Sequence, residues 1–575
     1  MRAKQWRSVA GLYVLALGIS NTSCNSILGL NKLSIEQASK DAGTSTGGSA
    51  NGGSGGSGGG GGSGGTTGGG ASGSGGDTTL TDASASCTTN NECTALATQL
   101  AADAGDGGTV PAVCTGMVKH CVNLYSVDCS YVTGDYTNDK AIIIGSLFST
   151  KGSQGATNLP RQQSATLAVE EINNAGGVPS GQSAGSDRPL VMVSCDESTN
   201  LLRAAGHLVT DLGVPAIVGP NTSQDTIDVS NGLTIMAGTL VISPTGVASS
   251  IGDLVDNNLT WLMVPTDVQR APLMISQIND LETMLKTARN ETAVKLSVIF
   301  RNDALGVGTR TALNSLTLNG KSLADNLGSN VQITGYDYKQ PNQDTIVAAT
   351  VKFAPDIVVL AGTAEAITEV MAPLEKGWPA APGGDSGVSN RPYYMLIDSV
   401  KVPELITAVT GDDDLRHRVR GTGVTPEPQS APVYSEFQVD YLSRYPGTSA
   451  KISGMGQSYD ATYAIAYAMA ATGATNVSGA SIASGLSRLT GGGSTFTIQS
   501  TQILASFQQL VSGSPITAIG TFAPLAWDKT GEVVGGRIEM WCINGGTPTP
   551  AFGSSGLTYD IETMMKNGTY AGCPP

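Results

Sequence analysis

The chain has 575 residues, a net charge of −15 and a sequence pI near 4.7, and only 14% of its residues are charged. This acidic balance argues against nucleic acid as a partner, because nucleic-acid recognition needs clustered Lys and Arg. The length is ample for a large core or two lobes, and the 75 glycines indicate a low-complexity segment.

Residues 1–23 have the features of an export signal. Three basic residues, the first of them Arg2, precede a short apolar stretch that ends before Cys24. The segment resembles a bacterial lipoprotein signal, which implies that Cys24 is the lipidated first residue of the mature chain, although Asn21 stands where such signals usually have Leu. An ordinary cleaved signal peptide is the alternative. Both interpretations predict export, and lipidation would anchor the chain to a membrane.

Residues 24–84 are expected to form a disordered Gly/Ser-rich linker. The stretch 43–76 is almost entirely Gly, Ser, Thr and Ala, and random-coil scaling gives it a root-mean-square reach of about 30 Å. It contains "GGSGG" around Ser54, but a G-x-S-x-G nucleophile motif needs a strand–turn–helix context that this coil does not offer.

Eight cysteines remain after Cys24, and five of them fall within a small module predicted at residues 85–130. The eight are Cys87, Cys93, Cys114, Cys121, Cys129, Cys195, Cys542 and Cys573. Zinc is the competing interpretation, but no C-x-x-C occurs and the three histidines are scattered. Export favours disulfides, with Cys542–Cys573 as the favoured pair. A cluster of five implies that one member, such as Cys129, pairs outside it with Cys195.

From Lys140 onward, apolar runs typical of buried strands alternate with segments of helical periodicity. Strands are predicted in 140–148, 188–195, 214–220, 238–245, 294–303, 330–338, 356–362, 393–398 and 418–425. Helices are predicted between them, for example in 161–174, 200–213 and around 308–316. The rhythm restarts after residue 264, which predicts two α/β lobes, each with a doubly wound parallel sheet. Ligands of such folds bind at the carboxyl ends of strands and between domains.

The stretch "IVGPNTSQDTIDVS", residues 217–230, ends a strand in Gly219-Pro220 and then places Thr222 and Ser223 where a helix can begin. Free N–H groups and the positive end of a helix dipole suit an anion such as a carboxylate. Thr and Ser also cap helices without any ligand, so both interpretations stay open.

Several motifs follow one another over about residues 138–545, in the order and at the spacing found in a known family. They include "IGSLFSTKG", "RQQSATLAVEEINNAGGV", "VPAIVGPNTSQDT", "TLVISPT", "SVIFRNDALGVG" and "PDIVVLAGTAEA". Together they resemble type I periplasmic solute-binding proteins of the leucine/isoleucine/valine-binding kind. The resemblance implies crossing segments near 260–266, 423–430 and 522–528. It assigns 138–262 with 430–522 to lobe 1 and 264–425 with 524–575 to lobe 2.

The resemblance also implies ligand contacts. Thr222 and Ser223 would receive a ligand carboxylate, and Thr245, Gly246 and Val247 would line the head-group site. Asp398, from lobe 2, would meet a ligand ammonium. Val247 lacks the hydroxyl that relatives have there, and Leu305 and Thr363 replace covering aromatics.

Structural alternatives accompany these assignments. Asp398 could cap the next helix, Thr245 and Gly246 could serve close packing, and Asp303 could be a loop charge or a site residue.

No catalytic residues, cofactor or metal site are predicted. The "NGKS" at 319–322 lacks the first Gly of a phosphate loop, and the acidic run at 411–415 lacks EF-hand spacing. The favoured function is an exported, lipid-anchored binding protein that delivers an amino acid or related carboxylate to an ABC permease. A sensory or surface lipoprotein without a transporter partner, and a structural lipoprotein that has lost binding, are the alternatives.

Overall fold

The structure is a computed structural model that describes residues 86–103, 108–115, 119–181, 188–340, 342–379, 390–473, 476–546 and 550–573. The predicted signal, Cys24 and nearly all of the predicted linker lie outside the described residues. None of the described helices is both long and apolar enough to cross a membrane.

Lobe 1 is built on a six-stranded sheet with the order β3-β5-β4-β6-β7-β8. The strands are β3 (Cys129–Thr133), β4 (Ile142–Phe148), β5 (Leu190–Asp196), β6 (Ala216–Val218), β7 (Leu240–Ser243) and β8 (Thr260–Leu262). Neighbours from β4 to β8 are parallel, as the sequence predicted. The sheet is not parallel throughout, because β3 runs antiparallel to β5 and covers its outer edge.

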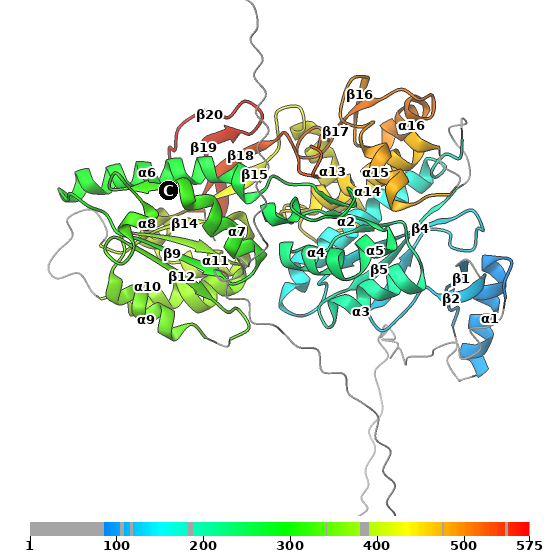
Figure 1. Ribbon diagram of the computed structural model, residues 1–575, viewed down its shortest axis with the longest axis horizontal. Helices are drawn as coiled ribbons and strands as arrows, with labels where there is room; N and C mark the ends of the chain where they lie inside the picture. The colour runs from blue at the N-terminus through cyan, green and yellow to red at the C-terminus, as the bar shows by residue number, and fades with distance from the viewer. Residues whose placement is uncertain are drawn as a thin grey trace, which may run out of the picture. The chain divides into compact units, whose positions relative to one another are not determined.

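Helices cover both faces of this sheet, which explains why β5 is buried along its whole length. Leu190 and Met192 pack in one apolar cluster with α2 and α14, whereas Val193 and Cys195 face a second cluster with α3. The helices of lobe 1 are α2 (Gly155–Asn174), α3 (Leu201–Gly206), α4 (Ser223–Val229), α5 (Ile235–Ala237), α13 (Ala431–Arg444), α14 (Met455–Thr472), α15 (Gly479–Leu486) and α16 (Ile503–Val511). A two-stranded parallel sheet of β16 (Ser494–Thr497) and β17 (Ile516–Ile519) lies beside them (Figure 1).

Lobe 2 is built on an eight-stranded sheet with the order β12-β9-β13-β14-β15-β18-β19-β20. The strands are β9 (Leu296–Arg301), β12 (Val331–Tyr336), β13 (Ile357–Ala361), β14 (Tyr393–Leu396), β15 (Val419–Thr425), β18 (Arg537–Asn544), β19 (Ala551–Asp560) and β20 (Met565–Asn567). The first five in the order are parallel, and the three C-terminal strands extend the sheet antiparallel. The sheet of lobe 2 is therefore mixed, with antiparallel strands at this edge, whereas the sequence predicted a parallel sheet.

The strands of lobe 2 alternate between two apolar layers. Val298 and Val359 pack with α6, and Ile299 and Leu360 pack with α10 on the opposite face; Figure 1 shows these two helices on either side of the sheet. The helices are α6 (Asp267–Arg289), α7 (Ala304–Ala312), α8 (Leu323–Asn326), α9 (Asp344–Phe353), α10 (Ala372–Gly377), α11 (Pro403–Val409) and α12 (Asp413–Arg418), and β10 (Thr317–Leu318) pairs with β11 (Lys321–Ser322).

The helix predicted around 308–316 begins earlier, at Ala304. The side chain of Asp303 accepts a hydrogen bond from the Gly306 N–H at 3.1 Å and so caps α7. Asp303 also forms an ion pair with Arg301. Its role in the structure is therefore local, in helix capping and charge pairing.

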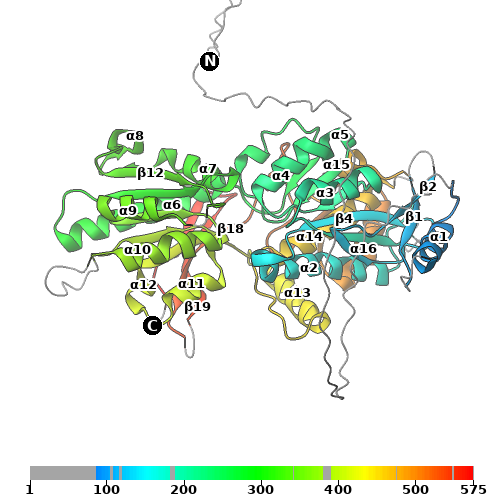
Figure 2. The same cartoon turned by 90° about the horizontal axis from the view of Figure 1, so that it is seen from below.

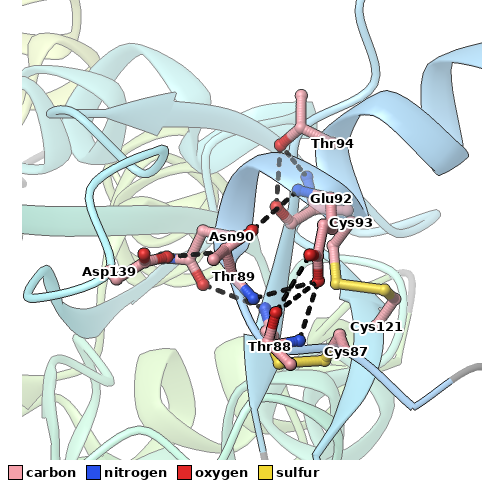
Figure 3. Close-up of a disulfide and its surroundings, with 11 residues drawn as sticks. Cys87, Thr88, Thr89, Asn90, Glu92, Cys93, Thr94, Cys121 and Asp139 are labelled. Atoms are coloured by element: carbon pink, nitrogen blue, oxygen red, sulfur yellow. Dashed lines mark hydrogen bonds between the residues drawn. A yellow bond between two sulfur atoms is a disulfide. The ribbon is translucent and has the colours of Figure 1, made fainter.

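The cysteine-rich module consists of α1 (Asn90–Asp103) and a hairpin of β1 (Ala112–Thr115) and β2 (His120–Asn123). Disulfides Cys87–Cys114 and Cys93–Cys121 join the helix segment to the hairpin, and Figure 3 shows the second of them with its surroundings. Three of these sulfurs lie close together, but all belong to disulfides, so none is a thiolate that could ligate zinc.

The module packs directly against lobe 1, and both views show it beside that lobe (Figures 1 and 2). The Asn90 backbone N–H donates to Asp139 Oδ1 at 2.7 Å, and its side-chain amide donates to the Asn138 carbonyl at 3.0 Å. Val113 and Leu124 join an apolar cluster of lobe 1. The two remaining disulfides are Cys129–Cys195, between β3 and β5, and Cys542–Cys573, which are the pairings expected from the sequence.

Contacts join the three segments in which crossings are expected. The Glu427 N–H donates to the Phe522 carbonyl at 2.9 Å, and the Trp527 indole donates to the Leu262 carbonyl at 2.7 Å. The 522–528 segment is thus hydrogen-bonded to each of the other two segments.

Candidate functional site

The carboxyl ends of β5, β6 and β7 place Glu197, Asn221 and Thr245 along one edge of lobe 1. Arg161 reaches this edge from α2. Its Nη1 donates to Asn158 Oδ1 and to Asn221 Oδ1, both at 2.8 Å, and its Nε donates to the Ser453 carbonyl at 2.7 Å. Three acceptors thus fix the guanidinium, while Nη2 has no hydrogen-bond partner among the described residues.

The hydroxyl groups of the predicted anion site, on Thr222 and Ser223, form hydrogen bonds within the protein. Thr222 caps α4, because its side chain accepts a hydrogen bond from the Asp225 N–H at 3.1 Å. Ser223 is only 2% exposed, and its Oγ accepts hydrogen bonds from the N–H groups of Val247 and Ala248 at 3.0 and 3.1 Å. Ser223 therefore links the turns after β6 and β7.

Thr245 and Gly246 shape the same turn. The Thr245 hydroxyl donates to the Asn221 carbonyl at 2.5 Å and contacts its Oδ1 at 2.8 Å. The Gly246 N–H donates to Ser243 Oγ at 3.1 Å, and a Cβ on Gly246 would come within 2.7 Å of that oxygen. Close packing thus requires the glycine, and Thr245 positions the Asn221 side chain that also binds Arg161.

Gly454 closes this cluster from the start of α14. Its φ is +91°, and a Cβ there would lie 2.4 Å from Thr245 Cγ2 and 2.8 Å from Arg161 Nε. Any larger residue would strain the backbone and push both side chains out of place. The glycine therefore sets the position of Arg161.

Asp398 lies just after β14 in lobe 2, at the start of a 3₁₀ turn. Its Oδ2 is 2.6 Å from Arg270 Nη1, and the two side chains are 15% and 7% exposed. Arg270 also donates from Nε to the Pro265 carbonyl at 2.8 Å. Two buried atoms beside this pair, Arg270 Nη2 and Asp267 Oδ2, have no hydrogen-bond partner among the described residues.

These groups line a cavity of about 20 Å³, which is room for a water molecule. Predicted site residues Val247 and Asp398 both line it, so the structure brings the turn after β7 together with the end of β14. The full lining is Val247, Asp267, Arg270, Ala271, Met274, Thr309, Ala312, Leu313, Ile397, Asp398 and Thr422.

An electrostatic interaction links Arg161, at the edge of lobe 1, with Asp398 of lobe 2. Burial lowers the pKa of Arg161 to about 10, and the charge of Asp398 opposes this shift. Arg161 of lobe 1 and Asp398 of lobe 2 are therefore within electrostatic reach of one another. Burial also raises the pKa of Asp267, although hydrogen bonds from Ser249 and Val268 counter it.

Leu305 and Thr363 lie apart from this cavity. Leu305 is buried in the apolar core of lobe 2. The Thr363 hydroxyl bonds to Glu365 and accepts a hydrogen bond from Arg301 at 3.2 Å. A contact between the lobes lies near this region, where the Ala304 N–H donates to Gln224 Oε1 at 3.1 Å.

Sequence reasoning missed Arg161, Asn221, Arg270 and Glu197. Glu197 is a buried acid beyond β5, and burial, reinforced by the charge of Asp225, raises its pKa well above the ordinary range. The sequence did contain a signal for these residues, because each is a charged or polar side chain among small or apolar neighbours. Charged side chains in such segments are buried only when they are paired or functional.

No family model matches the chain, and no curated protein matches it. Solved structures do. Leucine-binding protein LivK from Thermotoga maritima matches with a TM-score of 0.51 and 14% identity, over 72% of this chain and 97% of that protein. The likeness to LivK and the two-sheet architecture show that the chain has the type I periplasmic binding fold.

Two further solved structures resemble the chain with TM-scores of 0.49 and cover 72% of it. One is the branched-chain amino acid transporter substrate-binding protein LivJ from Streptococcus pneumoniae in complex with isoleucine, at 14% identity over 99% of that protein. The other is a solute-binding protein of an ABC transporter from Rhodopseudomonas palustris in complex with 4-hydroxybenzoate, at 12% identity over 96% of that protein.

Proposed function

We propose that this chain is an exported, lipid-anchored solute-binding protein that closes two lobes on a small polar ligand, an amino acid or a related carboxylate, for ABC-type import. The fold supports solute binding, because LivK, which shares it, is named as a leucine-binding protein. Membrane attachment would come from a lipid on Cys24 and not from a spanning helix.

The observation that carries the proposal is the guanidinium of Arg161, which three acceptors fix at the strand-end edge of lobe 1, with Asp398 of lobe 2 within electrostatic reach. Arg161 is held by Asn158, Asn221 and Ser453 and keeps one nitrogen unused. A guanidinium fixed in this way is preorganised to bind a carboxylate. We assign the ligand carboxylate to Arg161, with the two linked turns that carry Ser223 and Val247 beside it.

Lobe closure would couple binding to recognition by a partner. In an open form the ligand carboxylate contacts lobe 1 only, and closure adds the lobe 2 groups around Asp398. A ligand that makes better contacts in the closed form shifts the population toward it. The closed surface is then what a permease distinguishes from the empty protein.

A thermal-shift screen of the purified chain tests binding. Amino acids and simple carboxylates should stabilise it, by roughly 2.7 kcal/mol at a hundredfold excess over the dissociation constant. Arg161→Gln should lose this stabilisation, whereas Arg444→Gln, a surface variant on α13 whose residue pairs with Glu170, should keep it. Absence of any shift with the wild-type chain would contradict solute binding.

The anchor needs its own test. Cys24→Ala should release the protein from the membrane fraction of cells that express it, and labelling with a fatty-acid analogue should require Cys24. Retention of the variant in membranes without label would contradict lipid anchoring at this residue.

One structural observation favours a second candidate, a sensory or surface binding lipoprotein with no transporter. The disulfide-linked module packs against lobe 1 and shares its apolar cluster, so ligand-induced changes in lobe 1 would reach the module. Crosslinking in cells with and without ligand separates the two functions. Capture of a permease supports import, and capture of a signalling or surface protein through the module supports sensing.

A further inference from the structure

We infer, on the basis of the proposed solute-binding function, that Arg270 is a specificity-determining residue. Its guanidinium forms an ion pair with Asp398 in the position that a ligand ammonium would take, so that the site selects carboxylates that lack an α-amino group. The inference narrows the ligand class from amino acids and related carboxylates to the carboxylates alone.

Asp398 already has a cationic partner. Arg270 Nη1 lies 2.6 Å from Asp398 Oδ2, and the Pro265 carbonyl holds Arg270 Nε at 2.8 Å. Both side chains are largely buried, so water does not weaken the pair as it would on the surface. An α-ammonium entering here would place a second cation beside Arg270 and would have to share its one counter-charge.

Two guanidinium nitrogens have hydrogen-bonding capacity that the described residues do not use. Arg270 Nη2 is buried and has no partner among the described residues, and Arg161 Nη2 likewise has none in the described part of the chain. Both atoms are donors and guanidinium groups have no acceptor. A carboxylate offers acceptors to such donors, whereas an ammonium offers only more donors.

The nearby acids do not supply another ammonium site. Asp267 Oδ2 faces Gly308 of α7, where even a Cβ would lie 1.8 Å from that oxygen, so no ligand atom fits on that side. Glu197 lies at the edge of lobe 1, and burial raises its pKa well above the ordinary range, which favours its neutral form. Asp267 also lines the cavity, but burial raises the pKa of its carboxyl, which favours the neutral form; Asp398 does carry its charge at the cavity, and Arg270 already pairs with it.

Matched ligand pairs test the inference on the full chain. The probes are leucine with 4-methylpentanoate, phenylalanine with 3-phenylpropanoate, and glutamate with glutarate, measured by thermal shift and then by calorimetry. We expect each carboxylate that binds to do so at least tenfold more tightly than its amino acid. An amino acid that binds as well as its partner or better overturns the inference but upholds solute binding. Failure of all six to bind overturns both.

Two variants decide the role of the pair. Asp398→Asn should raise carboxylate affinity, because Asp398 offsets the charge of Arg270 in the wild type. An unchanged or lower carboxylate affinity in this variant would overturn the inference. Arg270→Gln should raise the affinity for an amino acid at least tenfold relative to its carboxylate partner, and no change in this ratio would also overturn it. Arg444→Gln is the control for folding and should bind like the wild type. If Arg270→Gln does not fold, the carboxylate affinity of Asp398→Asn by itself tests the inference.

Discussion

Asp398 Oδ2 and Arg270 Nη1 lie 2.6 Å apart, joining the end of β14 to the first turn of α6. The pair is largely buried, so removal of one partner leaves the other charge without compensation. We expect Arg270→Gln and Asp398→Asn each to lower the free energy of unfolding by about 2–3 kcal/mol. The double variant should cost less than the sum, with a coupling energy of about 1–3 kcal/mol in urea denaturation. Additive effects would contradict an energetically coupled pair.

The Ser223 hydroxyl is predicted to be a strong structural link. Ser223→Ala removes the acceptor of the Val247 and Ala248 N–H groups at a site that water barely reaches. We expect a loss of about 2–3 kcal/mol in the free energy of unfolding, since each unsatisfied buried donor is costly. Ser146→Ala, which removes one hydroxyl–hydroxyl bond to Ser194 in the core, is the control and should cost about 1 kcal/mol. Equal costs would contradict the double acceptor role.

Gly454→Ala should impair binding more than folding. The added Cβ meets Thr245 and Arg161, so the guanidinium cannot keep its position. We expect the affinity for a bound carboxylate to fall at least tenfold, which corresponds to about 1.4 kcal/mol. Gly447→Ala is a matched control, because its φ is +81° but a Cβ there meets nothing within 4 Å. Calorimetry on both variants measures the difference, and equal affinities would contradict the role of Gly454.

Stability should depend on pH through a buried carboxyl in lobe 1. Burial raises the pKa of Glu171 to about 7, even though the hydroxyls of Tyr459 and Tyr463 bond to it. The native state then binds a proton that the unfolded chain has released, so stability is full below the unfolded pKa of about 4.5 and falls as pH rises through 7.

Two variants test whether stability falls with rising pH because of Glu171. Glu171→Gln should reduce the fall between pH 5 and pH 8 by on the order of 1 kcal/mol, because one pKa unit corresponds to about 1.4 kcal/mol and the group is partly solvated. Tyr463→Phe removes a bond that lowers the pKa, so the fall should move to higher pH. Urea denaturation at each pH measures both effects. A wild-type pH slope that survives in Glu171→Gln would assign it to other groups.

Much of the fold followed from local patterns. The apolar runs at 140–148, 188–195 and 356–362 predicted buried strands, because strands covered on both faces are apolar along most of their length. Their alternation with helical periodicity predicted the two parallel-sheet lobes. The antiparallel strands β3, β18, β19 and β20 escaped prediction, because edge pairing depends on which segments meet in space.

The candidate site, like the fold, could be predicted only in part from the sequence. Local sequence patterns predicted the strand ends that carry Ser223, Val247 and Asp398, since residues that follow the buried strands of an α/β sheet gather at one edge. The bond from Ser223 to the Val247 turn and the pair of Asp398 with Arg270 arise from packing. Those contacts join residues 24 and 128 positions apart, and no local periodicity specifies them. They depend instead on how the packed lobes bring charged groups out of water, where each one needs a partner.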